Sequence, residues 1–174
     1  MRFCAFLRGV NVNGTSMKMA EVCHVFEAAG MQQVSSVLAS GNILFSSELP
    51  VSDLKIRLEK AMSNHFQYNA FLFIKNEDEI ASMLTDLPFQ TNPDFHTYVF
   101  IGEQNVETLL FNEFNKVEHS EGEKATMSGN HFYWQIPKGI TLTSDFGKIL
   151  GNKHYKNLIT SRNINTIQKV SQKI

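Results

Sequence analysis

The sequence predicts an α+β fold of two ferredoxin-like subdomains, each an antiparallel sheet with helices packed on one face. In the first half of the chain, apolar runs and amphipathic segments follow the order βαββαβ, which is typical of that fold. A partial repeat of this order, βαββα, follows in the second half. We therefore expect a first subdomain over residues 1–75, a connecting helix and linker over 76–93, and a second subdomain with a C-terminal helix over 94–174.

Hydrophobic periodicity predicts each element in turn. Alternating or continuous apolar runs indicate strands, and apolar residues that recur three and four positions apart indicate helices. Gly30 and Pro88 are typical of positions where a helix ends. The expected elements of the first half are a strand over 3–7, a helix over 17–29, strands over 34–39 and 43–45, a helix capped by Ser52, and a strand over 70–74. Those of the second half are helices over 78–87, 106–114, 146–150 and 163–172, and strands over 97–101, 124–127 and 131–136.

Composition and charge indicate a globular protein and argue against one class of function, nucleic-acid binding. Sixteen basic residues face 17 acidic ones, for a net charge of −1. Proteins that hold nucleic acid through its phosphates usually carry an excess of Lys and Arg, so the balance argues against broad nucleic-acid binding. The hydrophobic share, 43%, is ordinary for a globular chain of 174 residues.

Cysteine and histidine patterns predict neither a disulfide framework nor a metal site. Cys4 and Cys23 fall in apolar positions, where unpaired cysteine is commonly buried. The six histidines form no H-x-x-x-H pair and no Cys/His cluster, so we expect no metal and no cofactor. The N-terminal apolar stretch is too short for a signal peptide, and no later stretch approaches the length of a membrane span. We therefore expect a cytoplasmic protein without membrane contact.

Three polar segments stand out: residues 8–14 (RGVNVNG), the turn Ser40-Gly41-Asn42, and residues 160–166 (TSRNINT). Together with Lys18-Met19 they resemble, in the same order, the segments of a bacterial family of unknown function, DUF1697. This resemblance implies two ferredoxin-like subdomains and carries no assigned activity. The chain differs from the family's usual pattern at Asn13, where the family has Gly, and at Ile164, where it has Trp.

Amide and guanidinium groups in these segments favour an anion as ligand. A loop that leads from a strand into a helix can present backbone N–H groups to an anion, and an arginine can clamp phosphate or carboxylate with two hydrogen bonds. If the three segments converge, we expect a pocket for a small anionic ligand, phosphorylated or nucleotide-like. Whether such a pocket performs catalysis is left open by the residues. The candidate ligand-binding residues are Arg8, Asn11, Asn13, Lys18, Ser40, Asn42, Arg162 and Asn163.

Two other functions stay open at this point. Asn, Gly and Ser also fill tight turns for local backbone reasons, so the segments can simply stabilise a non-catalytic interaction protein. Ferredoxin-like sheets can also bind RNA by stacking bases on exposed aromatic side chains. Tyr98, Phe100, Phe132 and Trp134 are the candidates for stacking, although a basic-aromatic RNA-binding segment is missing from the sequence.

Overall fold

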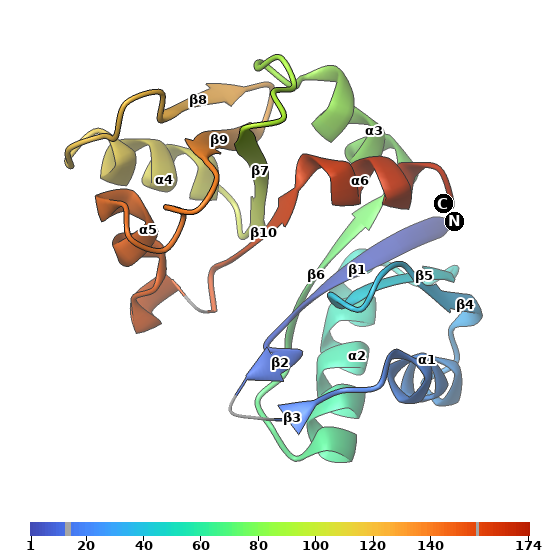
Figure 1. Ribbon diagram of the computed structural model, residues 1–174. Coiled ribbons are helices and arrows are strands. Elements are labelled where there is room, and N and C mark those ends of the chain that lie inside the picture. Colours follow the sequence, from blue (N-terminus) through green and yellow to red (C-terminus); the bar gives the residue numbers. More distant parts are fainter. Residues whose placement is uncertain (13–14, 156) are drawn as a thin grey trace. The chain divides into compact units, whose positions relative to one another are not determined.

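The computed structural model describes residues 1–12, 15–155 and 157–174, with the backbone alone for residues 11, 12, 15 and 16. Figure 1 shows the elements in chain order. The strands are β1 (Arg2–Arg8), β2 (Asn11–Val12), β3 (Thr15–Ser16), β4 (Gln32–Ser36), β5 (Asn42–Ser46), β6 (Phe71–Asn76), β7 (Phe95–Gly102), β8 (Lys124–Ser128), β9 (His131–Pro137) and β10 (Ile159–Asn163). The helices are α1 (Met19–Ala28), α2 (Val51–Phe66), α3 (Glu77–Thr85), α4 (Val106–Phe114), α5 (Asp145–Leu150), the 3-10 turn η1 (Lys153–Tyr155) and α6 (Ile164–Ser171).

The chain divides into two compact units. Unit 1 comprises Met1–Ala81 and Gln168–Ile174, and unit 2 comprises Ser82–Ile167. One boundary falls inside α3 and the other inside α6. Among the helices that the structure describes, none has both the length and the hydropathy to cross a membrane.

Unit 1 is a four-stranded antiparallel sheet in the order β4-β5-β1-β6. This is the ferredoxin-like arrangement, in which a hairpin and two crossovers produce an all-antiparallel sheet. Helices α1 and α2 lie on one face of the sheet (Figure 1). The side chains between helices and sheet form an aliphatic and phenylalanine core that includes Phe3, Val22, Phe26, Phe45, Leu54, Leu58 and Leu72.

Unit 2 repeats the arrangement with the order β10-β7-β9-β8. Its element order is therefore a full βαββαβ, because β10 provides the strand that the sequence prediction lacked. Residues 160–162 were expected in a loop, and that prediction was wrong: they pair with β7, with Arg162 opposite Val99. The strand was not predicted because most residues of this segment are polar. Its β-branched residues Ile159 and Thr160 nevertheless suit a pleated sheet.

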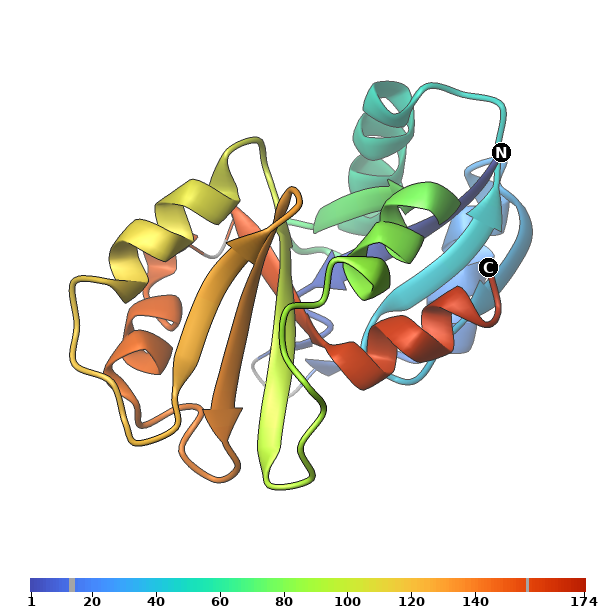
Figure 2. The same ribbon diagram turned by 90° about the horizontal axis from the view of Figure 1, so that it is seen from above.

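Aromatic side chains fill the core of unit 2. Phe100, Phe132 and Trp134 are buried in one cluster with Leu110 of α4 and Phe146 of α5, so they cannot stack on bases as an RNA platform requires. Figure 2 shows the ribbon of the sheet and these helices from above. Alternation along β9 places Tyr133 on the opposite face, where its hydroxyl donates to the carbonyl oxygen of Met83 over 3.1 Å. Burial and the nearby Asp86 raise the pKa of Tyr133 above its ordinary value.

In each unit, one of the predicted arginines lies on the sheet face opposite the core helices, which are α1 and α2 in unit 1 and α4 and α5 in unit 2. In unit 1, β1 places Arg8 on the same face as Phe6, whose partner across the sheet is Asn42. In unit 2, Arg162 lies on the same face as Val99. Phe6, Asn42 and Val99 on these faces are all buried.

Several boundaries in unit 1 differ from the sequence prediction by one to three residues, and two of them concern turns and helix starts. The strand expected over 34–39 runs from Gln32 to Ser36, and Leu38 adopts a positive φ of 61° in the turn that follows it. Helix α2 begins at Val51, so Ser52 lies inside its first turn and Pro50 occupies the capping position. Proline suits a helix start because its missing N–H group needs no partner there.

Candidate functional site

The turn Ser40-Gly41-Asn42 packs against the end of β1. The amide of Leu7 donates to the carbonyl oxygen of Gly41 over 2.7 Å. A Cβ atom added to Gly41 would lie 2.5 Å from Cγ2 of Val10, and the residue has φ of +73°. Only glycine allows this close approach at that backbone angle. Two of the three polar segments, about thirty residues apart in sequence, therefore meet at one end of the first sheet.

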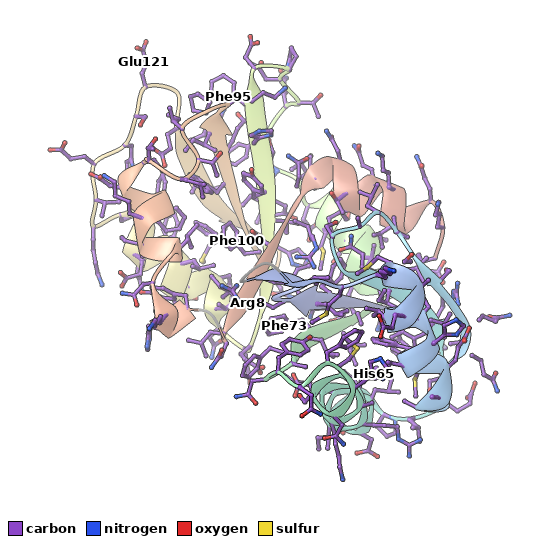
Figure 3. All side chains as sticks on the ribbon, turned by 60° about the horizontal axis from the view of Figure 1, so that its bottom comes forward. Arg8, His65, Phe73, Phe95, Phe100 and Glu121 are labelled. Atoms are coloured by element: carbon purple, nitrogen blue, oxygen red, sulfur yellow. The ribbon has the colours of Figure 1, made fainter. Side chains whose placement is uncertain are left out.

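The same end of the sheet carries Arg8 and receives the chain just before Lys18. Arg8 is the last residue of β1 and is half-buried, and burial lowers its pKa. Figure 3 labels its side chain. The amide of Met17 donates to the carbonyl oxygen of Val10 over 3.3 Å, which brings the chain back beside the end of β1. Lys18 follows immediately, exposed, at the capping position of α1.

Asn42 and Ser40 hold this turn in shape. Asn42 is 0% exposed, and its Nδ2 donates to the carbonyl oxygen of Val37 over 2.9 Å and to Oγ of Ser40 over 3.0 Å. A buried amide whose donors are both used stabilises its own loop. The structure thus assigns Asn42 a structural role, and its predicted contact with a ligand stays a prediction.

The other predicted residues fall in different places. Asn13 lies outside the described residues, and Asn11 is described by its backbone in β2. Arg162 is 8% exposed in β10, and its Nη1 donates to Oγ1 of Thr160 over 2.7 Å and to the carbonyl oxygen of Ser161 over 2.9 Å. Since Arg8 belongs to unit 1 and Arg162 to unit 2, their convergence in one pocket stays a prediction.

The C-terminal segment lines a hollow of about 330 Å³ in unit 2. Pockets that hold small ligands typically measure roughly 300–1,000 Å³. The lining comes from the turn before β7 and the start of that strand, from the residue that follows β9, and from the junction of β10 with α6. Among the residues that the structure describes there, it includes one lysine and no acidic side chain. Figure 3 shows Phe95 at the start of β7, the end of the strand where the hollow lies. The lining residues are Thr91, Asn92, Pro93, Phe95, His96, Thr97, Lys138, Asn163, Ile164 and Asn165.

Hydrogen bonds shape this hollow. Oδ1 of Asn92 accepts from the amide of Asp94 over 2.9 Å, and the carbonyl oxygen of Asp94 accepts from the amide of Lys138 over 2.9 Å. These bonds fix the turn before β7 next to the residue that follows β9. Lys138 thereby starts from a fixed backbone position while its side chain is exposed.

A second chain of bonds orients the side chain of His96. The amide of Asn165 donates to Oδ1 of Asn163 over 3.0 Å, so the other atom of that carboxamide is the NH₂ donor. This Nδ2 lies 3.3 Å from Nδ1 of His96. Nδ1 of the neutral ring therefore accepts, and the proton is on Nε2. Asn163, one of the predicted ligand-binding residues, orients a histidine that lines the hollow.

The sequence did not reveal this hollow. Its residues come from segments 91–97, 138 and 163–165, and no two of these segments form a recognisable pattern. The only local signal was Asn92-Pro93, which is typical of a turn. The polar character of residues 160–166 was visible, but its partner His96 was assigned no role because a lone histidine carries little information.

Comparisons with known proteins agree with the fold. The family described as "Protein of unknown function (DUF1697)" matches residues 1–133. The structure of the conserved bacterial protein SP0830 from Streptococcus pneumoniae is similar, with a TM-score of 0.80 and 21% sequence identity over 98% of this chain and 96% of that one. At this identity the likeness shows the fold alone. The curated proteins compared with the chain include no significant match.

Proposed function

The chain belongs to the DUF1697 family, and from that premise we propose that it binds a small anionic ligand, phosphorylated or nucleotide-like, through its polar segments. The observation that carries the proposal is the packing of the Ser40-Gly41-Asn42 turn against Leu7 and Val10, beside Arg8. Segments far apart in sequence are held together there by a contact that tolerates only glycine. Such precise placement of a polar turn next to a cation is expected of a binding site.

The charges at this end of unit 1 favour an anion. Arg8 is half-buried, so its guanidinium has lost part of its hydration. Hydrogen bonds and charge attraction from a bound anion compensate for that loss. A guanidinium can form two parallel hydrogen bonds with a phosphate or carboxylate. Lys18 adds a second, exposed positive charge at the start of α1. Catalysis is not part of the proposal.

Thermal unfolding in the presence of inorganic pyrophosphate or citrate tests the proposal. A ligand that binds only the native state raises the melting temperature. We expect at least one of the two anions to raise the melting temperature of the full chain, and Arg8→Ala to abolish the rise. The control is Arg57→Ala, which removes an exposed guanidinium from α2. The proposal fails if neither anion shifts the transition, or if both variants lose the shift equally.

The bonds of Asn42 favour a second function, in which the segments only stabilise the fold of an interaction module. Both amide donors of Asn42 are used inside the turn, and its side chain is buried. Under this alternative Arg8→Ala lowers the melting temperature of the ligand-free chain, and anions leave the melting temperature of both chains unchanged. The same set of measurements therefore separates the two functions.

A further inference from the structure

We infer that the hollow in unit 2 binds the phosphate group of a small phosphate monoester. This deepens the proposed function, with which it shares Asn163, and it does not require Arg8 or Arg162. The inference rests on three properties of the hollow: its volume, the charges of its lining residues, and the orientation of His96 by Asn163.

Volume and charge define the class of ligand. About 330 Å³ is room for a small molecule, and too little for a folded partner. Lys138 contributes a positive charge, and none of the described lining residues is acidic, so an anion is attracted and a cation is not. A lysine ammonium binds phosphate as a compact charge with three donors.

His96 adds a donor whose position is set by the protein. Because Asn163 donates to Nδ1, the neutral imidazole keeps its proton on Nε2 as a hydrogen-bond donor. A neutral donor on β7 and a cation on the residue that follows β9 suit a phosphate, which offers several acceptor oxygens. The start of α6 is not the basis of this inference, because Asn163 already caps the amide of Asn165.

Apolar lining residues indicate that the phosphate carries an organic group. Pro93, Phe95 and Ile164 share the hollow with the polar side chains. Their surfaces gain little from inorganic phosphate but can pack against a sugar or a base. A phosphate monoester matches both parts of this lining.

Isothermal titration calorimetry of the full chain tests the inference with four probes. AMP and ribose 5-phosphate are monoesters, adenosine lacks the phosphate, and inorganic phosphate lacks the organic group. We expect at least one monoester to bind at least tenfold more tightly than both adenosine and inorganic phosphate. If neither monoester binds more tightly than both adenosine and inorganic phosphate, the inference is overturned.

Two variants assign the binding to this hollow. Lys138→Ala should weaken monoester binding at least tenfold, whereas Lys153→Ala removes another exposed lysine of unit 2, one that lies outside the lining, and should leave it unchanged. Asn163→Asp keeps an oxygen that accepts from the amide of Asn165 but places a negative charge beside His96. It should keep the fold, read by circular dichroism, and weaken binding at least tenfold. Equal monoester binding in Lys138→Ala and Lys153→Ala would overturn the assignment.

The same titrations separate this inference from the proposed function. If Arg8→Ala abolishes anion binding and Lys138→Ala does not, the hollow is not the site and the proposed function stands. If Lys138→Ala abolishes monoester binding and Arg8→Ala has no effect on any anion, the hollow is the site and the contact with Arg8 is wrong. Amide chemical-shift changes with AMP should concentrate in residues 91–97, 138 and 163–165; changes confined to residues elsewhere would overturn the inference.

Discussion

In unit 1 the sheet is covered by α1 and by the 16-residue helix α2, whereas in unit 2 the second crossover helix, α5, has only 6 residues. The strand order is the same in both units. Along α2, Leu54, Leu58 and Met62 repeat every four residues and form a continuous aliphatic stripe. In α5 a single large buried side chain, Phe146, covers the core.

Phe146 shows how a short helix can close a core. Its ring lies 5.2 Å from Phe114, 5.2 Å from Trp134, 5.8 Å from Phe132 and 6.5 Å from Phe100, measured between centroids. Several of these pairs are edge-to-face, the geometry that aromatic rings favour. One topology therefore admits two cores: many small aliphatic contacts on a long helix, or a few large rings on a short one.

Phe146→Ala should have the largest effect of the changes considered, because a single residue closes the core of unit 2. We expect a loss of about 3–5 kcal/mol in the free energy of unfolding. Urea denaturation followed by tryptophan fluorescence measures it, since the chain's one tryptophan, Trp134, lies in unit 2. A loss below about 1 kcal/mol would mean that the cavity collapses easily and would remove the contrast with unit 1.

Leu58→Ala tests the other side of the comparison. Leu58 is fully buried between its neighbours on α2, so its truncation should cost about 2–4 kcal/mol. Far-ultraviolet circular dichroism during urea denaturation measures the loss. We expect this loss to be smaller than that of Phe146→Ala, because the other buried aliphatic side chains of α2 keep their contacts with the sheet. The opposite ranking would break the comparison.

Gly41→Ala addresses the turn that joins two polar segments in unit 1. The new Cβ would meet Val10 and Leu7 at 2.5 and 3.0 Å and sit at positive φ, so we expect a loss of about 2–3 kcal/mol. The control in unit 2 is Gly139→Ala, at φ of +92° but with nothing within 4 Å of the added atom. It should cost only about 1 kcal/mol of backbone strain. Equal losses in thermal unfolding would show that the close contact does not matter.

Glu123→Ala tests the polar contact at the rim of the aromatic core. Nε1 of Trp134 donates a buried hydrogen bond to Oε1 of Glu123 over 3.0 Å. A variant without the carboxylate leaves this indole N–H without its acceptor. We expect a loss of about 1–2 kcal/mol in urea denaturation. Glu123→Gln keeps an acceptor and should lose less. A variant as stable as the unchanged chain would show that water replaces the carboxylate.

Tyr68→Phe should have the smallest effect at neutral pH. The hydroxyl of Tyr68 is buried without a hydrogen-bond partner among the described residues, so its removal relieves a desolvation cost and should raise the free energy of unfolding by about 1 kcal/mol or less.

Burial raises the pKa of Tyr68 to about 12, above the value of 10 for an exposed tyrosine. The unfolded chain then loses its proton first, so stability falls as pH rises from about 10 to 12. Tyr68→Phe should make this alkaline loss shallower in thermal unfolding. An unchanged pH profile would contradict the assignment.

The sequence predicted the ferredoxin-like order of unit 1 and most elements of unit 2, because apolar spacing reports burial directly. Helix α4 has the predicted bounds, 106–114, since its apolar stripe is complete. Strand β10 was missed because Thr160 and Arg162 are polar although buried, so hydropathy gave no signal. The candidate residues were chosen by chemical type, and that choice could not separate the structural amide of Asn42 from the exposed ammonium of Lys18.

By itself the sequence determined the fold class, the family and the polar segments, all of which depend on the order of residues along the chain. Only the tertiary structure decided that Gly41 packs on Val10 and that Asn163 orients His96. It also decided that Lys138 lines the same hollow as Asn163 and His96. The physical reason is that these contacts depend on strand pairing and side-chain direction. Residues tens of positions apart become neighbours through hydrogen bonds that no local pattern encodes.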